Sequence, residues 1–427
     1  MQMKKLIIIN DSLDNKISYY LLAAFLIALP FQHFYSEILL TCFAIHTLIH
    51  LKKSRLKALE DKRVWIISSI FFMSLFAIFY SNYIAEGSKD VVHQLGILLF
   101  PVCLSVTNID VRKYQFSLLK IFAVTCTVTV VYLYIHAFHV IQYFHFPLLA
   151  IFDKEFINQN FSAPIELHST YLSMYVALSI SIFLFLFFKN PRLKNSKNIL
   201  FSVVLFAGLI QLSSRSVFIA MCLIFIIAIP ALLLRGKERL HFSVISFVVF
   251  LVLVSTIVNI DSFRKRYVSD FEDDLSESAV TPDLTETRMK RWILDLELIR
   301  QSPWVGYGSG SEKQVLKDKY FEEKFYRSYL FELNAHNQYL SFLIKNGIVG
   351  LLLYLYVLLY GFSWAIEKRH FLLLSFLILI AVVSVSENIL DVNKGIFFYS
   401  FFFSLFLLTS NEKIHSDLPD RRQLPFI

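Results

Sequence analysis

The segment His168–Phe188, HSTYLSMYVALSISIFLFLFF, decides the fold class of this chain. It contains no Asp, Glu, Lys or Arg, and a helix of about 20 apolar residues crosses the hydrocarbon of a membrane. Similar runs recur along all 427 residues, of which 56% are hydrophobic and only 17% are charged. Soluble domains carry about a quarter charged residues, and membrane-barrel strands would alternate with period two. The sequence therefore predicts an all-α, polytopic integral membrane protein.

Twelve apolar segments, separated by polar breaks, are the predicted membrane-spanning helices. They cover residues 17–31, 34–51, 64–82, 90–107, 116–141, 168–188, 198–213, 216–234, 241–259, 336–362, 370–386 and 395–410. Four parts follow from this pattern: nine spans in 1–259, a long outer loop with short helices in 260–335, three spans in 336–410, and a tail in 411–427. About twelve crossings place both termini on the same side of the membrane.

The positions of basic residues predict the orientation, because Lys and Arg concentrate in the short cytoplasmic loops of membrane proteins. With a cytoplasmic N-terminus, most of the 41 Lys and Arg residues lie in inner tails and breaks. The short outer loops hold only Lys89, Lys154, Arg215 and Lys394. Both termini are therefore predicted to be cytoplasmic. The net charge of +8 belongs to this pattern, so we expect no nucleic-acid partner.

Arg215 is the first candidate functional residue. It lies in Ser213–Ser216, a break too short for an ordinary loop between two apolar segments. An arginine at this depth is costly unless it faces a polar cavity or a partner. The alternative is an arginine whose side chain reaches out to the interface.

Arg288 and Arg291 are the next candidates, on a predicted helix over 286–301 in the long outer loop. Residues three apart share a face of a helix, and two guanidinium forks suit the oxygens of a pyrophosphate. The alternative is an interfacial helix that binds lipid headgroups.

His336 and Asn337 open the tenth predicted helix at its outer end. A histidine can act as a base near neutral pH, although a histidine at a helix entrance also serves structural roles. Glu387, Asp391 and Lys394 lie at the outer mouth of the last two helices. They are either an ion pair or a group that binds an acceptor, and the sequence leaves this open.

These motifs together resemble those of the bacterial O-antigen ligase and O-antigen polymerase family. His336-Asn337, followed after nine residues by Gly347 and then by Gly350, is similar to the family's histidine motif. Arg215 resembles the arginine of its Arg-x-x-x-Leu motif, with Ile219 where Leu is usual.

Two further motifs support the resemblance. Arg288, four residues before Trp292, resembles the family's second arginine in the long periplasmic loop. The run His168-Ser169-Thr170-Tyr171 resembles a recurrent feature of the same superfamily and is expected to line the cavity. The resemblance covers roughly residues 195–360 well, and the rest by topology.

The resemblance implies a multi-pass enzyme of the bacterial inner membrane with its active site facing the periplasm. It would transfer a glycan from undecaprenyl pyrophosphate to an acceptor hydroxyl, with inversion and with neither metal nor cofactor. The favoured acceptor is lipid A–core in lipopolysaccharide biosynthesis; the alternative is another carrier-linked glycan, as in a polymerase.

The resemblance also distributes roles among the candidates. His336, Arg215 and Arg288 would be catalytic, and Asn337, His168 and Tyr171, together with Arg291 on the spacing argument alone, would bind substrate. A lipid-linked glycan transporter is the alternative outside this class. It predicts ionisable residues at the membrane midplane and broken helices in paired repeats.

Overall fold

The computed structural model describes residues 8–189, 196–259, 264–265 and 286–410, and helices are the only regular secondary structure in these ranges. The all-α prediction is confirmed for this part of the chain. The predicted tail 411–427 lies outside the described residues, as does most of 260–285, the first part of the long outer loop.

The first part of the chain folds into a series of helices that coincide with nine predicted spans. Their bounds are α2 Leu13–Ala28, α3 His33–Ile49, the 3-10 helix η1 Lys53–Glu60, α4 Lys62–Phe76, α5 Ile84–His93, α6 Leu95–Val106, α7 Val111–Tyr143, α8 Gln159–Ser162, the 3-10 helix η4 Ala163–Ile165, α9 Ser169–Lys189, α10 Ser196–Leu212, α11 Arg215–Leu223, the π-helical η6 Ile224–Ala228, α12 Ile229–Leu232 and α13 Gly236–Asn259.

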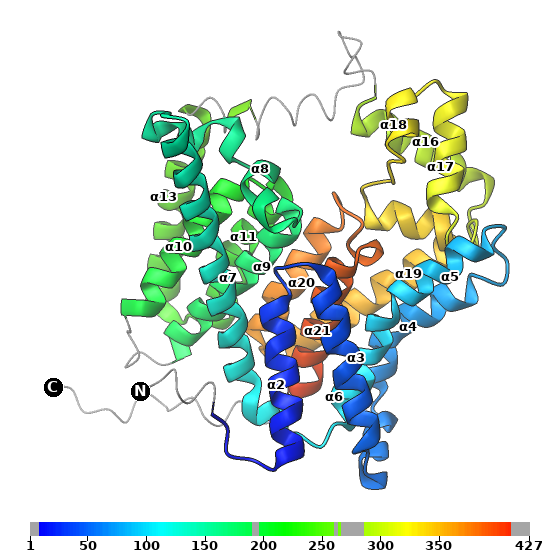
Figure 1. Ribbon diagram of the computed structural model, residues 1–427, viewed down its shortest axis with the longest axis horizontal. Coiled ribbons are helices and arrows are strands. Elements are labelled where there is room, and N and C mark those ends of the chain that lie inside the picture. The colour runs from blue at the N-terminus through cyan, green and yellow to red at the C-terminus, as the bar shows by residue number, and fades with distance from the viewer. Residues whose placement is uncertain (1–7, 190–195, 260–263, 266–285, 411–427) are drawn as a thin grey trace.

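The second part contains the long outer segment and the last three predicted spans. Its helices are α16 Arg288–Gln301, α17 Glu312–Glu322, α18 Tyr326–Leu330, α19 Gln338–Glu367, α20 Phe371–Val383, the 3-10 helix η9 Ile389–Asp391 and α21 Asn393–Thr409. Figure 1 shows α16, α17 and α18 in yellow, gathered at one end of the molecule above α5 and α19.

Among the described residues, five helical stretches are long and apolar enough to cross a membrane, or six if the bent pair α3 and η1 is one span. The five are Ile84–Val106, Val111–Tyr143, Ser169–Lys189, Arg215–Leu232 and Gln338–Glu367. All twelve predicted spans coincide with helix, but several of these helices, α20 and α21 among them, have 17 residues or fewer. The prediction of about twelve crossings is therefore not confirmed. The predicted spans are longer than some of the helices because they include apolar residues of the turns.

The segments that connect successive helices lie alternately at the two ends of the bundle, and hydrogen bonds join segments of the same end. At one end lie the breaks predicted to be cytoplasmic, and three hydrogen bonds join them. These are Tyr114 Oη to Asp11 Oδ2 at 2.7 Å, Asn108 Nδ2 to His50 O at 2.6 Å and Arg63 Nη1 to Leu407 O at 3.0 Å. At the other end, Gln32 Nε2 donates to Glu166 Oε2 at 2.8 Å, and α16–α18 lie on this side.

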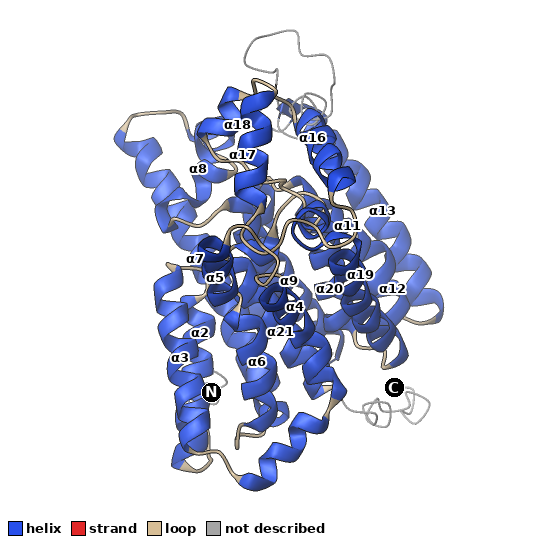
Figure 2. Cartoon of the chain, turned by 90° about the vertical axis from the view of Figure 1, so that its right-hand side faces the viewer, coloured by secondary structure: helices blue, strands red, loops and turns tan. Residues whose placement is uncertain are grey.

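The centre of the bundle consists of α20 and α21. Nearly every residue of these two helices is buried, as is typical of a helix that is apolar on all sides. Phe376 of α20 packs against Phe398 and Phe402 of α21, with ring centroids 5.6 and 6.5 Å apart. In Figures 1 and 2 the other helices surround this pair. The turn between α20 and α21 is thus held at the middle of the outer end.

Helix α19 is interrupted at Gly347, where φ is 61° and ψ is −160°. Residues 303–310, which we call the strap, fill the break with backbone hydrogen bonds. These are Tyr307 N to Ile344 O at 2.9 Å, Gly308 N to Lys345 O at 2.8 Å and Ile348 N to Pro303 O at 2.8 Å. Non-helical backbone at membrane depth is tolerated only where protein or a water-filled cavity surrounds it. The strap therefore supplies hydrogen-bond partners to the backbone of α19 at the break.

The other side of the strap is fixed to the end of α4. Ser309 Oγ donates to Ser74 O at 2.6 Å, and Ser81 Oγ donates to Ser309 O at 2.7 Å. The strap connects α16 to α17, so these bonds anchor the outer helices to the membrane bundle. Residues 286–335 are thus a docked part of the fold, and the candidate residues that they carry have defined positions.

Candidate functional site

His336 and Glu387 form a pair at the outer end of the bundle. Nδ1 of His336 lies 3.6 Å from Oε2 of Glu387, and the two side chains are 30% and 13% exposed. His336 belongs to the turn before α19, and Glu387 to the turn after α20. Both side chains are thus partly shielded, and His336 is the more exposed of the two.

Glu387 is the residue on which the candidate side chains converge. Thr170 Oγ1, from the start of α9, donates to Glu387 Oε1 at 3.4 Å. Arg288 Nη1, from the start of α16, donates to the carbonyl of Ser386 at 3.4 Å. Three segments distant in sequence therefore meet at the turn after α20.

The groups around Glu387 are mainly basic. Burial raises the pKa of this carboxyl, but the nearby imidazoles of His336 and His168 and the guanidinium of Arg288 hold it below its usual value. Glu387 is therefore ionised at neutral pH. The site combines one carboxylate with groups that can bind an anion.

Asn337 and Tyr171 meet at Asn388, the residue after Glu387. Asn337 caps α19, since its Oδ1 accepts the backbone N–H groups of Tyr339 and Leu340 at 3.0 and 3.2 Å. Its own backbone N–H donates to Asn388 Oδ1 at 2.8 Å, and Tyr171 Oη donates to Asn388 O at 3.5 Å. The side chains of Asn337 and Tyr171 are buried, so in this structure they stabilise the backbone of the site.

Arg215 is the first residue of α11, after a two-residue turn in which Ser213 has φ of 50°. The end of α10 before this turn contacts the outer loop, because Asn158 N donates to Gln211 O at 2.9 Å. Helix α11 packs against α20 and α9, whose outer ends carry Glu387 and His168. Helix packing thus brings Arg215, which is half-buried, to the end that holds His336 and Arg288.

Arg291 differs from Arg288 in its surroundings. Its side chain is 8% exposed, and its charge acts on Asp295 one turn further along α16. Burial and the charge of Glu312 raise the pKa of Asp295 well above its usual value, while Arg291 lowers it. Arg288 faces the His336–Glu387 pair, whereas Arg291 points into the core of the outer helices.

The sequence left the roles of Glu387, Asp391 and Lys394 open, and in the structure each of the three has a different partner. Glu387 pairs with His336, Asp391 accepts from Lys345 Nζ at 2.6 Å, and Lys394 donates to the carbonyl of Leu29 at 2.9 Å. The three do not form one ion pair. Lys345 could have been noticed in the sequence, because it is the one charged residue within the predicted span 336–362.

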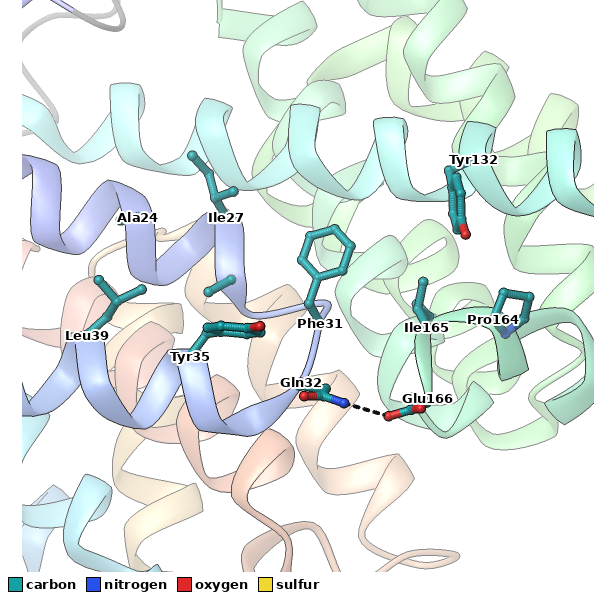
Figure 3. A pocket seen from close by; sticks show the side chains of 11 residues that line it. Ala24, Ile27, Phe31, Gln32, Tyr35, Leu39, Tyr132, Pro164, Ile165 and Glu166 are labelled. Atoms are coloured by element: carbon teal, nitrogen blue, oxygen red, sulfur yellow. Dashed lines mark hydrogen bonds between the residues drawn. The ribbon is translucent and has the colours of Figure 1, made fainter.

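A pocket of about 720 Å³ opens beside the outer end of α2, α3 and α7. Its walls are mainly apolar, and Ile27, Leu39, Tyr35 and Tyr132 are among the side chains that line it (Figure 3). The hydrogen bond from Gln32 to Glu166 closes its polar edge. Glu166 precedes His168 by two residues, so this edge leads toward the candidate site.

Within the described ranges, no group of three or more His, Cys, Asp and Glu side chains is placed to hold a metal ion. The site is instead built from imidazole, guanidinium and carboxylate groups at one end of an apolar helical bundle. These features are those of a polytopic membrane protein in which basic side chains surround one carboxylate at the end of the helical bundle.

Comparison with known families narrows this class. Residues 200–355 match the family model described as O-antigen ligase. The matched part of the chain carries Arg215, Arg288 and His336, and the match supports the resemblance to the O-antigen ligase family that these motifs predicted. No curated protein matches the chain. The match supports a membrane enzyme of O-antigen ligase or polymerase type.

Proposed function

We propose that this protein transfers a glycan from undecaprenyl pyrophosphate to an acceptor hydroxyl on the periplasmic face of the bacterial inner membrane. The convergence of His336, His168 and Arg288 on Glu387 is the observation that carries this proposal. It combines a base with an anion-binding group at one water-accessible point. The family match over residues 200–355 supports the same class of reaction.

In this mechanism His336 is the general base. Its Nδ1 faces the Glu387 carboxylate, so Nδ1 carries the proton and Nε2 is left to accept one, as in other carboxylate–histidine pairs. The acceptor oxygen forms a bond to the anomeric carbon as its proton passes to Nε2. Glu387 then stabilises the imidazolium that results.

The leaving group is the carrier pyrophosphate. The bond from the anomeric carbon to the phosphoryl oxygen breaks, and its electron pair stays on that oxygen. Arg288 and Arg215 would bind this anion and offset the charge that develops, which is electrostatic stabilisation of the transition state. Attack opposite the leaving group inverts the anomeric centre. The chain's own groups thus supply the base and the anion site without ATP.

The polyprenyl chain of the donor needs an apolar binding surface. The pocket between α2, α3 and α7 has apolar walls, and the side chains of Ile27 and Tyr132 are 49% and 48% exposed. We propose that a hydrocarbon chain of a lipid-linked substrate enters there from the bilayer. Its head would then extend past Glu166 toward His168.

The acceptor distinguishes the two activities within the family. We favour lipid A–core, which makes the protein an O-antigen ligase of lipopolysaccharide biosynthesis. The alternative acceptor is a second carrier-linked glycan, which would make it a polymerase. Both reactions use the same donor and the same groups, and they differ only in the molecule that brings the hydroxyl.

One feature of the fold bears on the transporter alternative. α19 is broken at Gly347, and Lys345 is buried next to the break. A transporter uses a broken helix to line a substrate cavity, whereas here the backbone of the strap fills the break. We therefore retain the enzyme as the proposed function.

Reconstitution tests the proposal directly. Purified protein in liposomes receives a carrier-linked glycan and lipid A–core, and the product is resolved on a lipopolysaccharide gel. We expect wild type to shift lipid A–core to higher mass and His336→Ala to lose this activity. Carrier-linked glycans of increased length, with lipid A–core unchanged, would indicate the polymerase. No transfer to either acceptor by the folded wild-type protein would refute the proposal.

A further inference from the structure

The backbone on both sides of His336 is held by two side chains from other segments. Ala335 N donates to Glu312 Oε1 at 3.1 Å, and Asn337 N donates to Asn388 Oδ1 at 2.8 Å. The two side chains also bind each other, because Asn388 Nδ2 donates to Glu312 Oε1 at 2.9 Å. Together they form a clamp, which we define as Glu312 and Asn388.

His336 needs such support because of its backbone conformation. Its φ is 46°, in the left-handed region, where a residue other than glycine is strained by about 1–2 kcal/mol. Strained conformations persist only where the surroundings over-determine them. Without bonds on both flanks, the turn would relax and the imidazole would move away from Glu387.

Glu312 is set up to hold its position. It is the first residue of α17, its side chain is 5% exposed, and its Oε2 lies 3.4 Å from Lys345 Nζ. Oε2 also accepts the hydroxyl of Ser341. A buried carboxylate is stable only if it is paired and hydrogen-bonded, and Glu312 has both kinds of partner. Lys345 and Ser341 thus hold Oε2 while Oε1 forms the clamp.

Asn388 connects the clamp to the functional pair. It is 2% exposed and directly follows Glu387, and its Nδ2 also donates to Asp391 Oδ2 at 2.9 Å. One amide therefore fixes the turn that carries Glu387 and the turn that carries His336. A shift of either turn changes the distance between imidazole and carboxylate.

We propose that Glu312 and Asn388 are positioning residues for the transfer reaction: they hold the backbone around His336 so that its imidazole stays against Glu387. This inference rests on the proposed role of His336 as the general base. Neither residue touches the substrate in this proposal. The sequence offered no signal for Glu312, which is one of many acidic residues in a long polar segment.

The test compares Glu312→Ala, Glu312→Gln and Asn388→Ala in the reconstituted full-length protein. Glu322→Ala is the matched control, since it removes an exposed carboxylate from the same helix. The donor is carrier-linked glycan and the acceptor is lipid A–core. For each variant, kcat and KM for the donor are measured per folded molecule, as quantified by size-exclusion chromatography.

We expect Glu312→Ala and Asn388→Ala to lower kcat on the order of 100-fold, because a displacement of about 1 Å can have that effect. KM for the donor stays within about twofold of wild type, since the anion-binding arginines remain. Glu312→Gln recovers at least about tenfold over Glu312→Ala, because the amide oxygen still accepts both N–H groups.

Two results would overturn the inference. One is a kcat of Glu312→Ala per folded molecule equal to that of Glu322→Ala, which means that the carboxylate matters only for folding. The other is a kcat of Glu312→Gln as low as that of Glu312→Ala. Full activity of His336→Ala would contradict the proposed function itself. This result differs from the two above, which contradict only the positioning role of Glu312 and Asn388.

Discussion

Gly347 offers a sharp test of the way the outer segment is anchored. Its φ of 61° and ψ of −160° lie in a region that is almost confined to glycine, and another residue there is strained by about 1–3 kcal/mol. A methyl group at this position would overlap the Trp304 carbonyl and lie 2.5 Å from the Val305 nitrogen. Overpacking of this kind costs about 1–3 kcal/mol more.

The change Gly347→Ala should therefore destabilise the protein by about 2–6 kcal/mol. This is a large part of the usual total of about 5–15 kcal/mol. The matched control is Gly236→Ala. Gly236 also has a positive φ of 54°, but no atom lies within 4 Å of the added methyl group. The control is strained by only about 1–2 kcal/mol.

The assay is thermal unfolding in detergent, followed by tryptophan fluorescence, together with the folded fraction on size exclusion. Gly347→Ala should melt clearly below Gly236→Ala or fail to give folded protein. Transfer activity should fall with it, because the strap leads into α16 and Arg288. Equal melting temperatures for the two variants would refute the view that the strap closely fills the break in α19.

Three further predictions concern the site and the topology. Arg288→Ala and Arg215→Ala should each lower transfer by about 100- to 1000-fold with normal membrane insertion, as measured on lipopolysaccharide gels; full activity of either variant would remove that arginine from the mechanism. The surroundings of Glu387 lower its pKa from the usual 4.5, so its stabilising charge is fully present above pH 4.5 and is lost as the pH falls through the lowered value. The difference in melting temperature between wild type and Glu387→Gln should therefore persist down to about pH 5 and disappear in stronger acid; a loss of the difference between about pH 7 and 6 would contradict this. In a background without the four native cysteines, Lys154→Cys should react with an impermeant maleimide from the periplasm and Lys57→Cys should not, whereas the reverse pattern would invert the topology.

Local sequence patterns predicted the helical class, which the structure confirms for the described residues. The same patterns named the candidate site residues and the orientation of the chain, which stay predictions. Runs such as His168–Phe188 contain enough apolar side chains to specify a buried or membrane helix from local composition alone. Arg215 and His336 stood out because each is a polar residue next to an apolar run, and Arg288 stood out because it shares a helix face with Arg291; all three lie on one predicted side. These are local signals, and a single sequence carries them.

The number of long spans was not determined in this way. A span predicted from hydropathy also includes apolar residues of the adjoining turns, whereas a helix ends where its backbone groups find other hydrogen-bond partners. The end of α20 shows this, since the predicted span reached residue 386 and the helix stops at Val383. Length therefore depends on capping, which is a matter of three-dimensional contacts.

Only the tertiary structure decided which polar groups meet. Glu387 contacts His336, 51 positions earlier in the chain, and Glu312 binds Asn388 across 76 positions. It also placed the strap against Gly347 and turned Arg291 toward Asp295. Such contacts arise because helices pack against one another, and the spacing of residues along one helix contains no information about its neighbour. For that reason the candidate base, the candidate arginines and Glu387 could be named from the sequence, while the pairing of Glu387 with His336 and the clamp could not.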